Sequence, residues 1–196
     1  TSDHPLGLVF DDEGICSGCR VHEEKDLLDW DSRLDDLKRL VAPYKSKTGK
    51  NYDCIVPVSG GKDSYFQTHI IKMELGFNPL LVTYDGNNYT ETGWRNLKRM
   101  QKVFDVDHII VKPPVKTLIK LNKLAFFAMG DMNWHAHMGI TTVPVQIAVE
   151  ENIPILIWGE HGYTDLSGQF STGDFPEMTY RDRLEHFGRG FEWNFF

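Results

Sequence analysis

The sequence predicts an α/β fold with three layers, in which helices cover both faces of a mainly parallel sheet. Short apolar segments alternate along the chain with longer segments whose apolar residues recur at helical spacing. Strand–helix alternation of this kind requires crossover connections, which make neighbouring strands parallel. The apolar segments are rich in β-branched residues, as strands covered on both faces should be. A smaller segment with two cysteines precedes the alternation.

Four apolar segments are predicted as strands of this sheet. They span residues 52–58, 80–84, 108–111 and 155–158. In a parallel sheet, ligands bind beyond the carboxyl ends of the strands. The loops that follow these segments are rich in Gly, Asp, Asn, Glu and His. We therefore expect them to meet at one edge of the sheet and to form the functional site.

Five segments are predicted as helices. They span residues 29–42, 63–75, 91–104, 115–129 and 142–151. Gly76 has the place of a glycine that ends a helix, and Pro144 is expected in the first turn of the last helix. Residues 1–20 are expected to form a loop, with a turn at 11–14.

Composition and charge exclude several classes of protein. The 196 residues are 41% hydrophobic and 25% charged, which is ordinary for a soluble globular protein. We expect a cytoplasmic protein because the chain has no apolar run long enough to span a membrane and no signal-peptide pattern. The net charge of −7 argues against a large nucleic-acid surface. Three cysteines give no disulfide framework, so reduced thiols are expected.

The hexapeptide SGGKDS lies between the first predicted strand and the helix that follows it. Its glycines let backbone N–H groups approach an anion closely, and the helix directs its unpaired N–H groups and positive dipole end toward the same anion. The spacings of a Walker A loop and of a dinucleotide-binding loop are both absent. We interpret the loop as a pyrophosphate cradle. Its expected contacts are Ser59, Gly60, Gly61, Lys62, Asp63 and Ser64.

The hexapeptide resembles the S-G-G-x-D-S signature of the PP-loop ATP pyrophosphatase superfamily. The resemblance implies an adenine nucleotide α-hydrolase-like fold that binds ATP with Mg²⁺ and cleaves it between the α and β phosphates. Such enzymes adenylate a carbonyl or amide oxygen, and nitrogen or sulfur then displaces AMP. Lys62 and Asp63 would be catalytic, with Asp63 beside the magnesium ion. The alternative is a glycine-rich turn without a ligand, in which Asp63 complements the helix dipole.

The residues that end the second predicted strand are further candidates. In PP-loop enzymes this point passes near the nucleoside, so the resemblance makes Thr83, Tyr84 and Asp85 candidates for contacting adenine or ribose. Asp85 is also a candidate for reaching the magnesium region. The alternative for Asp85 is an Asx-turn residue that closes the strand, helped by Gly86.

Candidates also follow the third and fourth predicted strands. Lys112 is expected to bind substrate by neutralising its pyrophosphate, and the alternative is a plain surface lysine. Gly159, which is expected to contact the cofactor, and Glu160 follow the fourth strand. A carboxylate at this edge can hold Mg²⁺ or orient ammonia, so Glu160 is a candidate catalytic residue. Its alternative is a solvated loop acid.

The cysteine pair Cys16-x-x-Cys19 is half of a structural zinc site. Zinc takes four ligands, usually Cys or His, and this chain has no second C-x-x-C. His135 and His137 offer two imidazoles at a spacing found in metal sites. Their alternative is a pair of polar residues in a glycine-rich connection, with a contact to substrate. The alternative for the cysteines is a pair of reduced thiols in a turn. Cys54, inside the first strand, is expected to be a core residue.

Longer segments resemble the N-acetyl sugar amidotransferase family of bacterial surface-polysaccharide biosynthesis, which includes lipopolysaccharide O-antigen. These segments are CSGC, YDCIVPVSGGKDSYFQ, NPLLVTYDG, WHAHMGITTVPVQIAVEENIPILIWGEHG and RGFEW, and the resemblance covers nearly the whole chain. Family members convert the acetamido group of a nucleotide-activated sugar into an acetamidino group. They take ammonia from a glutaminase and its partner subunit. The family pattern also carries a C-x-x-C before the point where this chain begins, which implies a four-cysteine zinc knuckle.

The hypothesis is an ATP-dependent amidotransferase in which the acetamido oxygen is adenylated and ammonia displaces AMP. The resemblance makes His135, His137 and Glu160 candidates for contacting the sugar or moving protons. We expect residues 1–50 to form the cysteine-containing segment and a linker helix, and residues 51–196 to form the ATP-binding domain. Family chains are longer, and this chain starts at Thr1 and ends in an aromatic run. We therefore expect a truncated chain whose ATP-binding domain is incomplete at its C-terminus.

Three other functions remain open on the sequence alone. One is a PP-loop enzyme that modifies tRNA, which would need a basic RNA-binding face. Another is an ammonia ligase that acts on a small carboxylate. The third is a subunit that binds ATP without catalysis. The complete Lys-Asp-Ser after the glycines disfavours an inactive site.

Overall fold

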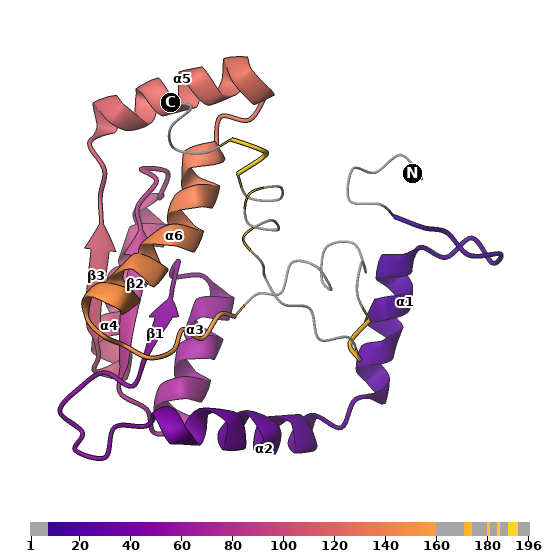
Figure 1. Ribbon diagram of the computed structural model, residues 1–196, viewed down its shortest axis with the longest axis vertical. Helices are drawn as coiled ribbons and strands as arrows, with labels where there is room; N and C mark the ends of the chain where they lie inside the picture. Colours follow the sequence, from indigo (N-terminus) through magenta and orange to yellow (C-terminus); the bar gives the residue numbers. More distant parts are fainter. Residues whose placement is uncertain (1–7, 160–170, 174–179, 181–183, 185–187, 192–196) are drawn as a thin grey trace. The chain divides into compact units, whose positions relative to one another are not determined.

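A parallel sheet of three strands forms the centre of the chain from residue 42 onward (Figure 1). Its strands are β1 (Cys54–Pro57), β2 (Pro79–Tyr84) and β3 (Asp107–Val111), in the order β1-β2-β3. In the register of the sheet, Ile55 of β1 is paired with Leu80 of β2, and Leu81 of β2 is paired with His108 of β3. Three of the four predicted strands are therefore confirmed, within two residues at each end.

The fourth predicted strand is reduced to a single parallel bridge between Leu156 and Ile55. The N–H of Ile55 donates to the carbonyl of Ile155, and the N–H of Ile157 donates to the carbonyl of Ile55, both at 2.9 Å. This segment runs along the side of β1 that β2 does not occupy. The loop after residue 158 thus leaves from the same edge of the sheet as the loops after β1 and β2.

The computed structural model describes residues 8–159, 171–173, 180, 184 and 188–191. The chain divides into two compact units. One consists of Thr1–Val41 with Glu160–Met178, and the other of Ala42–Gly159 with Thr179–Phe196. None of the helices in the described ranges combines the length and the apolar character that crossing a membrane demands.

The helices described between residues 42 and 159 belong to the unit that holds the sheet. They are α3 (Lys62–His69), α4 (Glu91–Phe104), α5 (Val115–Met129) and α6 (Trp134–Glu150). A π-helical turn, Ile70–Glu74, prolongs α3, and Gly76 follows it with a φ of +62°. A short 3₁₀ turn, Ala42–Tyr44, precedes the sheet. The predicted ranges of α4 and α5 and the terminating role of Gly76 are confirmed.

The prediction for α6 was wrong at its start. The helix begins at Trp134 rather than at residue 142, so Pro144 lies in its interior and not in its first turn. Buried contacts stabilise the helical turns of α6 that precede residue 142. The indole N–H of Trp134 donates to the carbonyl of Gly188 at 2.9 Å, and Gly139 lies against the ring of Tyr84. Tertiary packing thus overrides the helix-breaking signals of glycine and proline.

The sheet is covered on both faces. Ile55, Leu80 and Val82 pack with Ile147 and Ala148 of α6, which crosses in front of the sheet in Figure 1. The alternate residues of the strands point to the opposite face. On that face, Val56 and Leu81 of the strands are fully buried, as are Leu97 and Met100 of α4. Beside it, α3 and α4 contact each other through the tilted rings of Tyr65 and Phe104. The predicted three-layer α/β/α class is confirmed.

The smaller unit contains α1 (Ser17–Glu24), a 3₁₀ turn (Lys25–Leu27) and α2 (Trp30–Val41). The helix predicted at residues 29–42 is confirmed by α2. The turn at 11–14 is also confirmed, because the N–H of Gly14 donates to the carbonyl of Asp11 at 2.9 Å. The expectation of loop up to residue 20 was wrong, because α1 starts directly after Cys16, which takes the N-cap position with extended backbone angles.

Candidate functional site

The SGGKDS loop connects β1 to α3 and has the backbone geometry of an anion cradle. Gly60 has a φ of +80°, which L-residues with a side chain rarely adopt. Gly61 is the N-cap of α3 and has no side chain that could accept from the first turn of the helix. The N–H groups and the positive dipole end of α3 therefore face the loop without a competing side-chain cap.

The two serines of the loop close it internally. The N–H of Ser59 donates to Oγ of Ser64 at 2.9 Å, and the two hydroxyl oxygens lie 3.3 Å apart. The hydroxyl of Thr68 donates to the carbonyl of Ser64 at 2.7 Å. Ser64 is only 7% exposed, and its hydrogen bonds hold the loop against α3. The Ser59 and Ser64 hydroxyls nevertheless lie side by side at the cradle.

Lys62 and Asp63 are at the surface of the cradle. Nζ of Lys62 lies 2.7 Å from Oδ1 of Asp63, and their side chains are 89% and 61% exposed. An ion pair this exposed contributes little to stability and its partners are free to reorient. Lys62 can therefore turn to a phosphate. Asp63 can turn to a cation that accompanies it.

Asp85 and Lys112, which follow β2 and β3, are brought together. Asp85 is 2% exposed; its Oδ1 accepts from the N–H of Asn87 at 2.8 Å, and its Oδ2 forms an ion pair with Nζ of Lys112 at 3.0 Å. The same Nζ lies 4.1 Å from the ring centroid of Trp94. Asp85 thus forms the Asx turn that closes β2. Lys112 supplies the countercharge that a buried carboxylate requires.

Thr83 points to the other side of the sheet from Tyr84. Its hydroxyl donates to the carbonyl of Val58 at 2.6 Å and lies 2.9 Å from Nε2 of His108. Burial lowers the pKa of His108 to about 4, so its imidazole is neutral at pH 7. With Thr83 buried and both of its hydrogen bonds used inside the protein, its side chain holds β2 to its neighbours at the ligand edge.

Tyr84 lies on the α6 face and is joined to His135 and Asn122. Its hydroxyl is 3.2 Å from Nδ1 of His135, and the side-chain amide of Asn122 donates to Nε2 of His135 at 2.8 Å. Because Nε2 accepts, the ring proton is on Nδ1 and is donated to the Tyr84 oxygen. Burial first, and the charge of His137 second, lower the pKa of His135 and favour this neutral form.

His135 and His137 do not form a metal pair. Both lie in the first turn of α6, where residues two apart point to different sides of a helix. His137 instead has its Nδ1 3.7 Å from Oδ2 of Asp131, and Arg189 lies 3.8 Å from the same oxygen. Within the described residues, neither imidazole belongs to a group of three or more His, Cys, Asp or Glu side chains placed to hold a metal ion. The glycine-rich connection that was the alternative for this segment is a regular helix instead.

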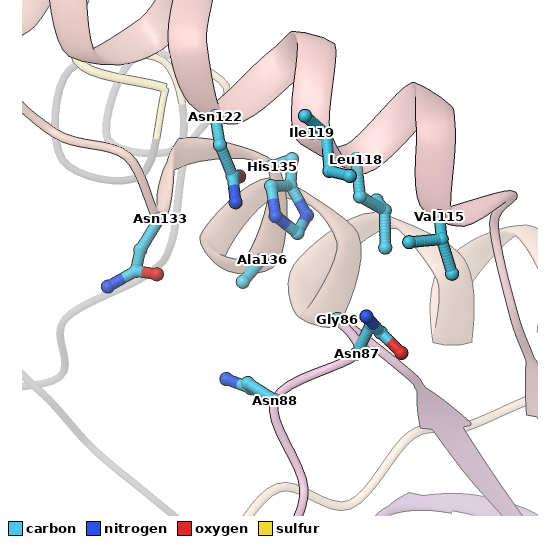
Figure 2. A pocket seen from close by; sticks show the side chains of 10 residues that line it. All are labelled: Gly86, Asn87, Asn88, Val115, Leu118, Ile119, Asn122, Asn133, His135 and Ala136. Carbon is cyan, nitrogen blue, oxygen red and sulfur yellow. The ribbon is translucent and has the colours of Figure 1, made fainter.

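A small cavity lies beyond the carboxyl end of β2 (Figure 2). It measures about 120 Å³ and is bounded by the loop 86–88, by one side of α5 and by the start of α6. Figure 2 shows amide side chains from all three segments around it. Its polar lining residues are Asn87, Asn88, Asn122, Asn133 and His135. Of these, sequence reasoning selected only His135.

The two asparagines of loop 86–88 were visible in the sequence as part of a polar loop after a strand. Nothing in the sequence pattern placed Asn122 and Asn133 beside them. Asn122 lies in the middle of α5 and Asn133 at the N-cap of α6. They reach the cavity only because α5 and α6 pack against each other at this end of the sheet.

Gly159 ends the segment beside β1 and lies against α3. A Cβ at position 159 would be 2.6 Å from Oε1 of Gln67, whose amide nitrogen donates to the carbonyl of Ile157. Gly159 therefore brings the fourth loop close to the helix that begins at the cradle. The candidate Glu160 lies outside the described residues.

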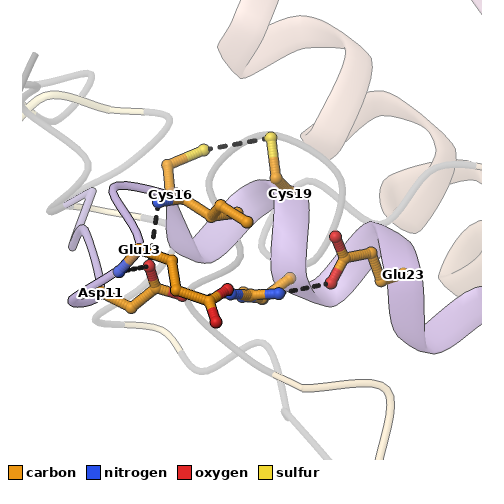
Figure 3. Close-up of polar contacts among 7 residues, drawn as sticks. Asp11, Glu13, Cys16, Cys19 and Glu23 are labelled. Carbon is orange, nitrogen blue, oxygen red and sulfur yellow. Dashed lines mark hydrogen bonds and ion pairs between the residues drawn. The ribbon is translucent and has the colours of Figure 1, made fainter.

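The two cysteines of the C-x-x-C lie together at the start of α1 (Figure 3). Their sulfur atoms are 3.4 Å apart. The backbone N–H of Cys19 lowers the pKa of Cys16, while the contact with Cys16 raises the pKa of Cys19. Two thiolates on one zinc ion at tetrahedral angles lie about 3.8 Å apart. Within the described ranges, however, no group of three or more His, Cys, Asp or Glu residues is placed to hold a metal ion. The two cysteines amount to no more than two of the four ligands that a structural zinc site requires.

Arg20 holds the loop before the cysteines to α1. Its guanidinium pairs with Asp11 at 2.7 Å, with Glu23 at 3.0 Å and with Glu13 (Figure 3). Glu24, one turn further, accepts from the hydroxyl of Ser171 at 2.7 Å and from the N–H of Thr172 at 2.9 Å. The cysteine pair is therefore carried by a helix anchored at both ends.

The comparisons with known proteins identify the fold. No protein-family profile matches the chain. An uncharacterized protein of Methanocaldococcus jannaschii is 27% identical over 107 residues, which are 53% of this chain and 37% of that protein. The NH3-dependent NAD synthetase from Campylobacter jejuni, solved in complex with nitrate ion, is similar with a TM-score of 0.54 and 13% identity, over 74% of this chain and 62% of that one. NMN synthetase from Francisella tularensis gives a TM-score of 0.48 and 11% identity, over 70% and 59%.

The likeness to the NAD synthetase shows that the chain has the adenine nucleotide α-hydrolase-like, PP-loop fold. The chain spans less than two thirds of the length of each of these three proteins.

Proposed function

We propose that this chain belongs to an ATP-dependent amidotransferase that converts the acetamido group of a nucleotide-activated N-acetyl sugar into an acetamidino group and releases AMP and pyrophosphate. The observation that carries the proposal is the SGGKDS loop, which combines a left-handed glycine, an N-cap without a side chain and two adjacent serine hydroxyls at the start of α3. This arrangement suits the pyrophosphate of ATP, because it offers N–H groups, hydroxyls and a helix dipole to one anion.

Lys62, Gly60 and Gly61 would stabilise the negative charge that develops on the departing pyrophosphate. Backbone N–H donors fixed before the reaction stabilise such charge without reorganisation. Lys62 is exposed. Its ammonium group would turn away from Asp63 and contact the phosphate. Asp63 would then hold the Mg²⁺ that ATP brings, since hard cations prefer carboxylate oxygens. Glu160 stays a candidate for the same ion or for orienting ammonia.

Adenylation makes amide chemistry feasible. An acetamide is a poor electrophile, and attack by ammonia alone would have to expel a poor leaving group. With AMP on the amide oxygen, ammonia attacks the carbon, the C–O bond to AMP breaks, and the acetamidino product forms. No side-chain nucleophile is required. Neutral ammonia is the competent nucleophile, which supports delivery from a glutaminase through a partner subunit.

The sugar substrate rests on the resemblance of five sequence segments to the N-acetyl sugar amidotransferases. The uncharged cavity beside β2 is compatible with a sugar substituent, because none of its lining residues is acidic or basic apart from the neutral His135. A second candidate is an ammonia ligase that acts on a small carboxylate, since the fold is shared with an NH3-dependent synthetase. The acidic net charge of −7 disfavours the tRNA-modifying alternative.

Acceptor-dependent release of pyrophosphate tests the proposal. The chain would be supplied with ATP, Mg²⁺ and ammonium chloride, and with UDP- and CMP-linked N-acetyl sugars or with small carboxylates. Pyrophosphate that depends on a sugar nucleotide, with a product one mass unit lighter, supports amidation. Pyrophosphate that depends on a carboxylate favours the second candidate. Orthophosphate release, or ATP binding without cleavage, contradicts both.

A further inference from the structure

We propose that the cavity bounded by loop 86–88, α5 and the start of α6 binds a small uncharged acylamino group of the acceptor, with the amide against the asparagines and the methyl group against α5. This inference rests on the proposed function, because it assigns a place to the group that would be amidated. It is argued from the volume, the charge and the lining chemistry of the cavity (Figure 2).

The volume limits what the cavity can hold. It measures about 120 Å³, somewhat less than a cavity of about 150 Å³ that takes in benzene, a ring of six carbon atoms. A group of about four or five non-hydrogen atoms therefore fits. An acetamido group, with a nitrogen, a carbonyl carbon, an oxygen and a methyl carbon, is of this size. A purine ring system is larger than the cavity.

The lining carries no formal charge at pH 7. None of the lining residues is Asp, Glu, Lys or Arg. His135 is the one titratable group among them, and burial together with the charge of His137 lowers its pKa, so it stays neutral. A phosphate or a carboxylate would be desolvated here without a countercharge, which is costly. A neutral polar group is therefore the suitable occupant.

His135 forms a wall of the cavity rather than a hydrogen-bonding partner. Its Nδ1 is directed to Tyr84 and its Nε2 to Asn122. Its Cε1 faces Gly86, where a Cβ would lie 3.6 Å away. Hydrogen bonds to an occupant must then come from side-chain amides such as those of Asn88 and Asn133. An amide offers both donors and acceptors, as an acylamino group requires.

The apolar side of the cavity comes from α5 and α6. Val115, Leu118 and Ile119 line it from α5, and Ala136 lines it from α6. Moving a methyl group from water to this wall is favourable through the hydrophobic effect. The lining contains no Phe, Tyr or Trp on which a nucleobase could stack, which argues against adenine as the occupant.

The cavity also lies at the edge of the sheet where the loop of the proposed pyrophosphate cradle is found. It follows β2 directly, the SGGKDS loop follows β1, and these two strands are hydrogen-bonded neighbours. An acylamino group held here and ATP held on the cradle would thus approach each other from adjacent loops. The asparagines thus position the amide for adenylation, and the residues of the SGGKDS loop act on the phosphates of ATP.

A binding experiment tests the proposal without requiring turnover. ¹H–¹⁵N and methyl NMR spectra of the chain would be recorded during titrations with N-acetyl-D-glucosamine and with D-glucose. We expect the Ala136 methyl and the Asn122 and Asn133 amide signals to shift with the N-acetyl sugar and not with glucose. Shifts confined to other residues, or equal shifts with both sugars, would overturn the assignment. Adenosine that shifts these signals when the N-acetyl sugar does not would make the cavity a nucleoside site.

Two variants and one control sharpen the test. Ala136→Leu fills the cavity and should weaken binding of the N-acetyl sugar at least tenfold. Ile119→Ser removes part of the apolar wall at a half-exposed position that does not threaten folding. It should weaken the preference for N-acetyl over N-formyl sugars. Val145→Leu adds bulk to the exposed side of the same helix, away from the cavity, and should leave binding unchanged. N-acetyl binding that survives both Ala136→Leu and Ile119→Ser contradicts the proposal.

The readouts separate this inference from the proposed function. If the cavity signals shift with N-acetyl sugars and no sugar-dependent pyrophosphate is released, the cavity assignment stands and the amidotransferase assignment fails. If pyrophosphate release depends on N-acetyl sugars and Ala136→Leu leaves its KM for the sugar unchanged, the function stands and the cavity assignment fails.

Discussion

The Cα atom of Leu97 lies so close to Gly60 that a Cβ on this glycine would be 2.9 Å from it, and equally close to the Leu97 backbone nitrogen. Real Cβ atoms are essentially never found this near to backbone atoms. Because Leu97 is in the middle of α4, this contact seats the SGGKDS loop directly on a helix that is itself part of the core. The proposed cradle is thus held by the fold and does not depend on a ligand for its shape.

We predict that Gly60→Ala lowers the stability of the fold, whereas Gly61→Ala weakens ATP binding with little effect on stability. Gly60→Ala should lower the free energy of unfolding by about 1–3 kcal/mol, because the new methyl group overlaps α4 and φ is +80°. Gly61 has ordinary backbone angles, and a Cβ there would be 3.5 Å from the nearest atom, Oγ of Ser59. Gly61→Ala should therefore change stability by less than about 0.5 kcal/mol and still weaken ATP binding.

Urea denaturation and equilibrium dialysis with ATP would measure the two effects. Equal losses of stability in the two variants would contradict the contact with α4. Unchanged ATP affinity in Gly61→Ala would remove the reason for placing pyrophosphate at this loop.

Lys112 is predicted to stabilise the fold through Asp85. Lys112→Met keeps the aliphatic stem and removes the cation that faces the buried carboxylate at 3.0 Å. Because Lys112 is half exposed, the expected loss is about 1–2 kcal/mol, below that of a fully buried pair. Lys98→Met is the matched control, since Nζ of Lys98 also approaches the ring centroid of Trp94, at 5.5 Å, but forms no ion pair within the described part of the chain. Equal denaturation midpoints for the two variants would count against the role of Asp85.

The stability of the sheet should depend on pH through His108. Burial lowers its pKa from 6.5 to about 4, so the unfolded chain takes up a proton at a higher pH than the folded protein does. The neutral imidazole therefore contributes its full stability above pH 6.5. This contribution is lost progressively as the pH falls toward 4, by roughly 3 kcal/mol.

His108→Gln should flatten this part of the profile, because glutamine keeps a donor for Thr83 and does not titrate. The measurement is the free energy of unfolding in urea at intervals from pH 7.5 to 4, for both proteins. The difference between wild type and variant isolates His108 from the carboxyl groups that titrate in the same range. A constant difference across the range would show that His108 is not the titrating group.

The three thiols are predicted to react in a fixed order with iodoacetamide. Cys16 should be labelled first, since the N–H of Cys19 lowers its pKa, and Cys19 should follow. Cys54 is fully buried and its pKa is raised to about 12, so it should react only in denaturant. If Cys16 and Cys19 are zinc ligands, stoichiometric zinc will protect both and a chelator will restore labelling. Labelling that zinc does not slow would leave them as a pair of free thiols.

The sheet and the helices around it could be predicted closely because their signals are local. The ranges of α4 and α5 follow from periodicity and from the residues at their ends, and the SGGKDS loop follows from its glycines. The start of α6 could not be found this way. Gly139 weakens an isolated helix, yet in the fold it is required, because a Cβ there would be 2.5 Å from the ring of Tyr84. Only the packed structure shows that the glycine serves a close contact.

The residues of the candidate site also fall into those that could be predicted from the sequence and those that only the packed structure reveals. Residues adjacent in sequence, such as those of the cradle, could be assigned from their spacing. The pairing of Asp85 with Lys112 was within reach, because both follow neighbouring strands of a parallel sheet. The cavity beside them could not be predicted, since Asn122 comes from the middle of α5 and reaches the site only through the packing of two helices. A pattern within one segment carries no signal for such a contact.

The most direct test of the account follows the oxygen atom of the acetamido group. A sugar nucleotide labelled with ¹⁸O in its N-acetyl carbonyl would be incubated with the chain, ATP, Mg²⁺ and ammonia, and the AMP and sugar products would be examined by mass spectrometry. The account predicts that the label appears in AMP and is lost from the sugar. Label that stays in the sugar while ATP is cleaved, or that appears in orthophosphate, would contradict adenylation of the acetamido oxygen.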